Sequence, residues 1–342
     1  MPFKIPNLNL NQIPFMKSFK KLCLLFALSL TVFSCNSDNE TTTQNSSTTK
    51  LNRTSTPKRF LFDATKAETA GNADWVISEN SSNTPLRFPN PDQSTVTATT
   101  LENYWRGGLS AWGIELAKEG HYVESIVSGG SITYGSTTNA QDLSKFDVFV
   151  VDEPNILFTS AEKTAILNFV KNGGGLFMIA NHNGSDRNND GRDSAAIWND
   201  LMTKNSVKSN PFGLTVELVN FSQTTTNILS DVTNTILNGS QGAVTKLKFS
   251  AGASIKLTPT ANATAKGLIW KTGLAKTSTT GVMCASSTFF NGRVVLVTDS
   301  SPADDGTGNP NDVLYNGWSD ATVANSHSRL HLNASYWLAK LQ

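Results

Sequence analysis

The feature that most constrains the fold is an alternation of apolar runs and helix-like segments between residues 59 and 180. The apolar runs are RFLFDAT (59–65), HYVESIV (121–127), FDVFVVDEPN (146–155) and GLFMIA (175–180). Apolar residues recur at helical spacing in LENYWRGGLSAWGIELAKEG (101–120) and TSAEKTAILNFVKNGG (159–174). Strands that are apolar on both sides are typical of a parallel sheet covered by helices. We therefore predict a mostly parallel α/β sheet with helices on both faces.

Further along the chain the pattern changes and then returns. The helix at 159–174 should begin with a capping box, because Glu162 follows Thr159 by three residues. Residues 194–202 read as another helix, and residues 212–276 read as a β-rich antiparallel insertion. GRVVLVTDSSP (292–302) restores a buried strand. HSRLHLNASYWLAKL (327–341) should form a closing helix whose inward residues are Leu330, Ala334, Trp337 and Leu338.

The N-terminal segment has the features of a targeting signal. Three lysines (17, 20 and 21) precede LCLLFALSLTVF (22–33), an apolar run too short to span a bilayer. VFSC resembles a bacterial lipobox, which makes residues 1–35 a lipoprotein signal with Cys35 as the lipidated residue; a signal cut without lipidation is the alternative. Met16 begins a typical signal of its own, so the sequence leaves two starting residues open.

The residues after Cys35 are polar and of low complexity. Residues 36–58 should be a disordered tether, because they offer almost nothing to bury. CNSDNE resembles the export signal of surface lipoproteins in Bacteroidetes-type bacteria, and this resemblance implies attachment to the outer membrane. The remaining residues, 59–342, are within the size of one domain.

The net charge argues against a nucleic-acid-binding protein, and the cysteine content argues against a disulfide-bonded one. A formal net charge of +1 gives no electrostatic reason for a nucleic-acid partner. Cys23 leaves with the signal and Cys35 carries the lipid, so only Cys284 remains and no intramolecular disulfide is expected. Its apolar surroundings in GVMCASSTFF favour a buried core residue over a catalytic thiol.

The block from Phe146 to Asn183 resembles the class I glutamine-amidotransferase-like superfamily, in particular its ThuA-like and related branches. The resemblance is carried by the DEPN ending of one strand, the following helix, and GGGL before the next strand. It implies a flavodoxin-like or amidotransferase-like sheet. Glutaminases of this superfamily place a nucleophilic cysteine after that strand, whereas this chain has Asn181 and His182 there. Glutamine hydrolysis is therefore not expected.

Polar groups follow four of the predicted strands. They are Asp63, then Asp152 and Glu153, then His182 with Asp186, then Asp299. Ligands of open α/β sheets collect beyond the carboxyl ends of the strands, so these groups should meet at one edge.

The segment after the GLFMIA strand, NHNGSDRNNDGRD (181–193), matches the start of a calcium loop. Asp186, Asn188 and Asp190 would supply oxygens, but Ile197 stands where an EF-hand needs its glutamate. A partial calcium site closed by Asp193 remains open. The other interpretation is a polar turn in which Asp193 or Ser194 caps the next helix.

A second acidic loop, TDSSPADDGTGNPND (298–312), contains Asp299, Asp304, Asp305 and Asp312. If the two loops meet, the predicted metal ligands are Asp186, Asn188, Asp190, Asp193 and Asp304. His182, Asp299 and Glu153 would be the catalytic residues, with His182 as general base.

The remaining histidines and several tryptophans carry weaker signals. His327 and His331 are four residues apart and could share a zinc ion, although a surface or half-buried pair without metal is the plainer interpretation. Trp75, Trp105 and Trp112 fit either a sugar platform or core packing.

These observations lead to three hypotheses from different classes. The first is a surface lipoprotein that acts as a metal-assisted hydrolase on glycans. The second is a non-catalytic carbohydrate-binding or surface-assembly lipoprotein in which calcium only stabilises the loops. The third is a scaffold without a ligand.

Overall fold

The computed structural model describes residues 56–312 and 315–342. The predicted signal at 1–35, with Cys35, and most of the tether predicted at 36–58 lie outside the described residues. No helix within the described ranges is both long enough and apolar enough to cross a membrane.

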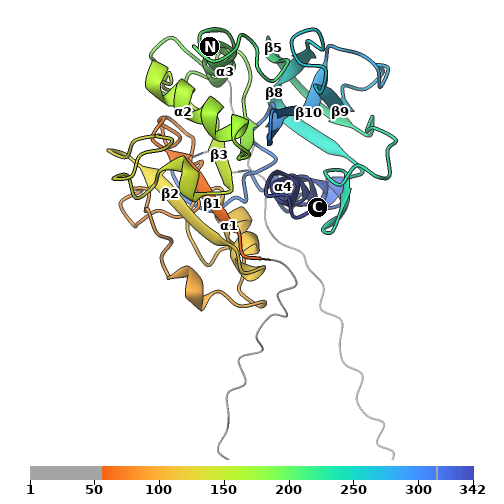
Figure 1. Cartoon of the computed structure of the whole chain (residues 1–342). Coiled ribbons are helices and arrows are strands. Elements are labelled where there is room, and N and C mark those ends of the chain that lie inside the picture. The colour runs from red at the N-terminus through yellow and green to blue at the C-terminus, as the bar shows by residue number, and fades with distance from the viewer. Residues whose placement is uncertain (1–55, 313–314) are drawn as a thin grey trace, which may run out of the picture. The chain divides into compact units, whose positions relative to one another are not determined.

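A nine-stranded sheet organises the chain, in the order β2-β1-β3-β4-β11-β10-β8-β5, with β9 paired to β10 (Figure 1). Its strands are β1 (Arg59–Ala64), β2 (Tyr122–Val127), β3 (Val148–Asp152), β4 (Gly175–Ile179), β5 (Leu214–Thr225), β8 (Leu247–Leu257), β9 (Lys266–Trp270), β10 (Val282–Phe289) and β11 (Gly292–Val297). Strands β6 (Asn238–Gly239) and β7 (Gly242–Ala243) form a separate pair. The five strands from β2 to β11 run parallel, as the sequence predicts.

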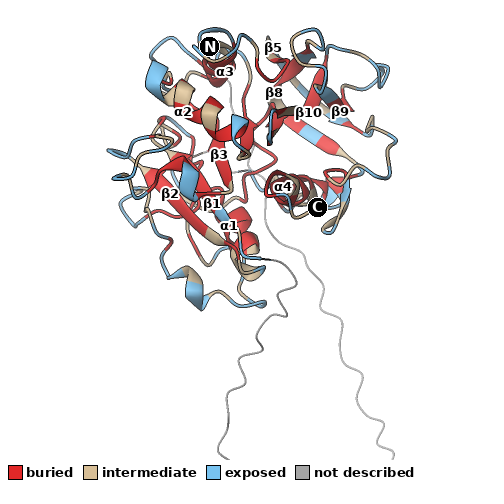
Figure 2. Cartoon of the chain, in the orientation of Figure 1, coloured by how far each residue is buried: buried red, intermediate tan, exposed pale blue. Residues whose placement is uncertain are grey.

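Two helices cover each face of the parallel strands. The helices are α1 (Ser110–Lys118), α2 (Ser160–Lys171), α3 (Ser194–Thr203) and α4 (Ser326–Leu338). Alternate residues of β1 point to opposite faces, so Phe62 packs in the cluster that contains α1 and α4, and Leu61 packs in the cluster that contains α2 and α3. Both clusters are almost fully buried (Figure 2). The predicted α/β class, with helices on both faces, is confirmed.

The first helix is shorter than the predicted segment at 101–120. Regular helix begins only at Ser110, because Gly107 and Gly108 lie in close contact with the loop that contains Asp74 and Val76. Gly107 has φ of +143°, and a Cβ on it would lie 2.3 Å from the carbonyl oxygen of Val76. The apolar periodicity of the sequence does not show that constraint. The second helix begins as predicted, with both hydrogen bonds of the Thr159–Glu162 capping box present.

The strands predicted as an antiparallel insertion at 212–276 extend the main sheet. Strands β8 and β9 pair with β10, which pairs antiparallel with β11, and β5 forms the outer edge. The β5–β8 pairing is irregular between Glu217 and Phe221. There the carbonyl of Val219 accepts a hydrogen bond from the backbone N–H of Asn183, in the loop after β4.

The histidines of α4 are more buried than the surface or half-buried pair suggested by the sequence. His327 and His331 are 2% and 0% exposed. His327 Nε2 accepts from the Lys248 backbone, and the His331 ring packs against Trp112 and Phe177. Burial lowers the pKa of His331 to about 3, so the ring is neutral. On the same helix Trp337, predicted to face inward, is only partly buried.

Cys284 and three of the tryptophans lie in the core. Cys284 is a fully buried residue of β10, as expected. Trp75, Trp105 and Trp112 are at most 3% exposed. Core packing, rather than a sugar platform, is therefore the role of these three rings.

Candidate functional site

The carboxyl ends of the parallel strands bring several predicted residues to one edge of the sheet. Strands β1, β3, β4 and β11 are adjacent and in parallel register. The segments that follow β3, β4 and β11 contact one another directly. Asn181 Nδ2 lies 2.9 Å from Glu153 Oε2, and Ser300 Oγ lies 2.8 Å from the same oxygen. The sequence interpretation of a shared edge is therefore correct for these strands.

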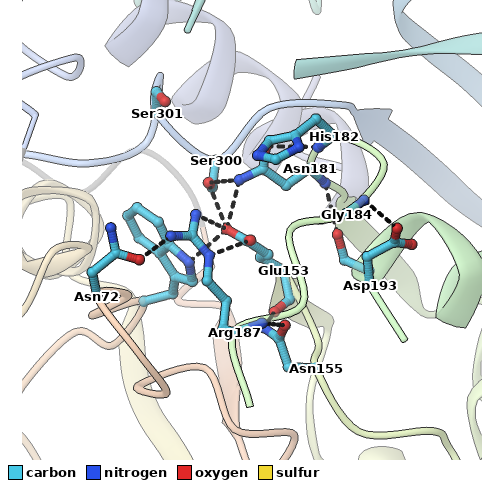
Figure 3. Close-up of polar contacts among 12 residues, drawn as sticks. Asn72, Glu153, Asn155, Asn181, His182, Gly184, Arg187, Asp193, Ser300 and Ser301 are labelled. Atoms are coloured by element: carbon cyan, nitrogen blue, oxygen red, sulfur yellow. Dashed lines mark hydrogen bonds and ion pairs between the residues drawn. The ribbon is translucent and has the colours of Figure 1, made fainter. Parts of the chain in front are cut away.

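Glu153 is the centre of this arrangement (Figure 3). Its side chain is fully buried and accepts hydrogen bonds from four other residues. Oε2 accepts from Trp75 Nε1 at 2.8 Å, from Asn181 Nδ2, from Ser300 Oγ, and from an Arg187 guanidinium nitrogen at 3.3 Å. Oε1 accepts from Arg187 Nε at 2.8 Å. These donors engage both oxygens of the buried carboxylate.

The backbone at Glu153 is unusual for a residue that follows a strand. Its φ is +45°, in the left-handed region that non-glycine residues rarely occupy. The turn is held by a hydrogen bond from Glu153 N–H to the Ile179 carbonyl, and by Asn155 Nδ2, which donates to the Glu153 carbonyl at 2.7 Å. Backbone strain of this kind persists only where surrounding contacts determine the conformation, and it is common at functional sites.

Arg187 closes the site from the loop after β4. Besides Glu153, its guanidinium contacts Asn72, and its backbone N–H donates to Asn155 Oδ1 at 2.9 Å. Burial lowers the pKa of Arg187, but the attraction of Glu153 outweighs that effect and raises the pKa above its usual value. Arg187 and Glu153 form a partly buried ion pair in which each partner compensates the other's desolvation.

Two further acids at this edge lack a cationic partner within hydrogen-bond reach. Asp152 is 2% exposed, and neither of its side-chain oxygens has a hydrogen-bond partner among the described residues. Burial and the nearby Glu153 raise the pKa of Asp152 well above its ordinary value. Asp299 accepts from the backbone N–H groups of Ser250 at 2.5 Å and Ser301 at 2.9 Å, but burial still raises its pKa to about 7. Both carboxyls therefore favour the protonated form more strongly than exposed ones.

His182, the predicted general base, lies at the margin of the buried cluster. Its Nδ1 is 3.1 Å from Asn220 Nδ2 and 2.9 Å from the carbonyl oxygen of its neighbour Asn183. Its backbone N–H donates to Asn181 Oδ1. No described carboxylate hydrogen-bonds to its ring. The geometry orients the imidazole without supplying the acidic partner that a base of a catalytic triad would have.

The predicted calcium loop is ordered by its own side chains. Asp186 accepts from the backbone N–H groups of Asp190 and Gly191, at 3.0 and 2.7 Å. Asn188 donates to the Asn155 carbonyl. Asp193 caps α3 through the Ala196 N–H, and its other oxygen accepts from Gly184. The helix-capping interpretation of Asp193 is confirmed.

Asp304 is engaged in the second acidic loop. Its oxygens accept from the backbone N–H groups of Gly306 and Tyr315, and burial raises its pKa to about 7. Within residues 56–312 and 315–342, no three His, Cys, Asp or Glu side chains lie close enough together to hold a metal ion. Calcium at the predicted ligands Asp186, Asn188, Asp190, Asp193 and Asp304 stays a prediction.

A pocket of about 260 Å³ opens beyond the end of β11, and we call it the β11 pocket. It is lined by Lys248, Ser250, Ser301, Tyr315, Asn316, Gly317, Asp320 and His327. Lys248 and Asp320 form an ion pair across 3.0 Å, and Tyr315 is 42% exposed. Ser250 and Ser301 are the residues whose backbone N–H groups hold Asp299, so the pocket adjoins the buried cluster at this edge.

Four residues complete the Glu153 cluster, and none was a predicted site residue; Asn181 was noted in the sequence only as standing at the position of a nucleophilic cysteine. Trp75 lies in a loop 78 residues before Glu153 and has no motif around it. Ser300 and Arg187 stand next to residues that were predicted, Asp299 and Asp186, but their types suggested no role. One signal was present: a glutamate expected to be buried needs a cation, and Arg187 and Arg192 are the arginines of the loop after β4.

No protein-family model and no curated protein matches the chain in sequence. Solved structures match it in fold. One is the mmIFT52 N-terminal domain, with a TM-score of 0.46, 12% identity, and coverage of 82% of this chain and 97% of that one. A putative ThuA-like protein from Parabacteroides merdae has a TM-score of 0.42 and 13% identity, over 84% of this chain and 91% of the other.

An exo-β-1,4-mannosidase from an Opitutaceae bacterium has a TM-score of 0.39 and 11% identity, over 83% of this chain and 36% of the enzyme. At these values the likeness concerns the architecture and transfers no activity. The chain is an α/β protein with a mixed sheet and a parallel core, and its neighbours in structure include ThuA-like proteins.

Proposed function

We propose that this chain is a non-catalytic carbohydrate-binding protein whose ligand occupies the β11 pocket. The observation that carries the proposal is the chemistry of that pocket. It combines the exposed ring of Tyr315 with hydroxyl, amide and ion-paired side chains at the edge where α/β sheets bind ligands. An aromatic face for the apolar side of a sugar, beside donors and acceptors for its hydroxyls, suits a carbohydrate.

The volume of the pocket limits the size of that ligand. About 260 Å³ is just below the range of roughly 300–1,000 Å³ typical of small-molecule sites. A single sugar unit, or the end of a longer glycan, is therefore a better fit than an internal stretch of several units.

The neighbouring Glu153 cluster supports binding over catalysis. A general base or nucleophile needs a free lone pair directed at the substrate. The oxygens of Glu153 are surrounded by donors from Trp75, Asn181, Ser300 and Arg187, and its side chain is fully buried. We assign Glu153 to the rigid floor of the edge, where it fixes the segments after β3, β4 and β11.

The proposal includes the cell envelope as the location. A lipid on Cys35 would anchor the chain to the outer membrane, and residues 36–58 would hold the binding domain away from the bilayer. Calcium in the 186–193 loop would stabilise that loop without taking part in chemistry.

The predicted hydrolase is the second candidate, and one observation favours it. Burial raises the pKa of Asp299 to about 7, which is suitable for a general acid near neutral pH, and the residues that hold Asp299 line the β11 pocket. In that case His182 would be the second acid–base group. The Asp299 side chain is itself 0% exposed, so it would need to become accessible when substrate binds.

A glycan array followed by calorimetry tests the proposal on the purified full chain. We expect Tyr315→Ala to weaken binding about tenfold, since aromatic stacking contributes on the order of 1 kcal/mol beyond area burial. Phe290→Ala is the matched control, because Phe290 is also an exposed ring but lies in the turn between β10 and β11. Undiminished binding by Tyr315→Ala would refute the pocket assignment. Turnover of chromogenic glycosides or esters that disappears in His182→Ala would establish the hydrolase instead.

A further inference from the structure

A second pocket lies near the beginning of β11, away from the carboxyl edge. It has a volume of about 320 Å³, and we call it the Trp337 pocket. It is lined by Asp231, Thr233, Asn234, Thr235, Ile236, Thr264, Lys266, Ser286, Ser287, Thr288 and Trp337. Ser286 pairs with Val295 within β11, whereas the β11 pocket is lined by Ser301, beyond the end of that strand, and the two pockets share no lining residue.

Three segments form this pocket, and each contributes a different chemistry. The loop at 231–236 and the β9–β10 pair supply hydroxyl groups, and the last turn of α4 supplies the indole of Trp337. The guanidinium of Arg293 lies 4.9 Å from the Trp337 ring centroid, so that contact holds the ring in place. The aromatic wall is therefore fixed before any ligand arrives.

Hydroxyl groups in the pocket remain available for a ligand. Thr233 Oγ1 donates to Asp231, and Thr264 Oγ1 donates to Asn262. In contrast, the side-chain hydroxyls of Thr235, Ser286 and Thr288 have no hydrogen-bond partner among the described residues. Each hydroxyl can both donate and accept, as the hydroxyls of a sugar can.

The charges of the pocket cancel. Asp231 and Lys266 are its only charged side chains, and they form an ion pair across 3.0 Å. A site with balanced charge gives little attraction to an anion or a cation. A neutral ligand fits better.

We propose that the Trp337 pocket is a second binding site, independent of the β11 pocket, for a neutral pyranose sugar. The ring of the sugar would stack on Trp337, and its hydroxyls would bond to Thr235, Ser286 and Thr288. Two sites on one chain would let it hold two points of a glycan, or two glycans, and so raise the avidity for a polymer.

Tryptophan fluorescence isolates this site. Of the seven tryptophans, Trp75, Trp105, Trp112, Trp198, Trp270 and Trp318 are buried, and only Trp337 is partly exposed. Acrylamide should therefore quench mainly Trp337. We expect at least one of D-glucose, D-galactose, D-mannose and D-xylose to reduce this quenching about twofold or more at saturation in the full chain. In Trp337→Phe both the quenching and its response to sugar should disappear.

Matched variants separate the hydroxyl contacts from the fold. Thr288→Val combined with Ser286→Ala should lower the affinity for the protecting sugar about tenfold, which corresponds to about 1.4 kcal/mol. Thr260 is exposed and lines neither pocket, so Thr260→Val should leave the affinity for that sugar unchanged. Circular dichroism checks that each variant is folded.

The test also separates this site from the β11 pocket. Protection of Trp337 should survive Tyr315→Ala, even if that variant loses glycan binding elsewhere. The proposal is overturned if none of the four sugars protects Trp337, if the double variant binds the protecting sugar as tightly as the parent chain, or if sodium sulfate protects as well as a sugar does.

Discussion

The indole nitrogen of Trp75 donates to Glu153 Oε2 across 2.8 Å, although 78 residues separate the two in the sequence. The tryptophan comes from a loop and the glutamate from the end of β3. Their contact shows that Glu153 receives a donor from a loop far from β3 in the sequence.

Replacing Glu153 with alanine should strongly destabilise the fold. The change leaves the partly buried guanidinium of Arg187 without its counter-ion, and breaking such a pair costs about 3–5 kcal/mol. Urea unfolding should show this loss, while Glu119→Ala, at an exposed position after α1, should change stability by less than about 0.5 kcal/mol. Equal urea midpoints for Glu153→Ala and the parent chain would show that the cluster contributes nothing.

Stability should fall as the pH rises from 6 to 9. Burial raises the pKa of Asp63 to about 6, of Asp299 and Asp304 to about 7, and of Asp74 to about 8. A folded-state pKa above the unfolded value means that the stabilisation is fully present at low pH and is lost as the pH passes the folded pKa. Thermal melting between pH 6 and 9 measures the trend, and a melting temperature that rises over this range would contradict it.

Asp74 offers a specific test of that pH dependence. Its Oδ2 accepts from the Asn309 N–H, and its Oδ1 has no hydrogen-bond partner among the described residues, so asparagine can keep the observed bond. The parent chain should lose more unfolding free energy between pH 7 and pH 9 than Asp74→Asn does, by on the order of 1 kcal/mol. Asp190→Asn, at an exposed position, is the control that should leave the slope unchanged.

Calcium should stabilise the chain if the 186–193 loop binds it. At a concentration 100 times its dissociation constant, a ligand adds about 2.7 kcal/mol, which corresponds to a rise of a few degrees in melting temperature. The rise should be reversed by chelator and absent in Asp186→Asn with Asp190→Asn. A melting temperature that changes with neither calcium nor chelator would refute a structural calcium site in this loop.

Thr159→Ala should lower stability by about 1 kcal/mol, because it removes the side-chain oxygen that caps α2. Thr164→Ala provides the comparison within α2, since the Thr164 hydroxyl caps no helix end: it donates to the Ser160 carbonyl and lies 3.2 Å from Ser206 Oγ. Chemical unfolding of both variants measures the difference. Equal effects would mean that the capping box adds no stability of its own.

The sequence predicted the parts of the fold that local patterns encode. Apolar runs located the parallel strands, and the spacing of Thr159 and Glu162 located the start of α2. The limits of α1 were wrong because Gly107 adopts its backbone conformation to approach Val76, a contact between distant segments. The burial of His331 was also missed, since its aromatic neighbours come from other elements.

In the candidate site, too, the sequence predicted one part and not another. Strand polarity predicted that the ends of β3, β4 and β11 would meet, because parallel register is a property of the fold class. The roles of individual side chains could not be predicted. The contacts of Glu153 with Trp75 and Ser300, for example, depend on where loops pass in three dimensions.

The assembly of Glu153 from distant segments has a consequence for biosynthesis. Its partner Ser300 is 147 residues further along, and this residue leaves the ribosome long after β3. Until then the nascent carboxylate lacks one of its donors, and contacts that span so much chain form slowly. The domain can therefore close around Glu153 only after β11 and Ser300 have been translated.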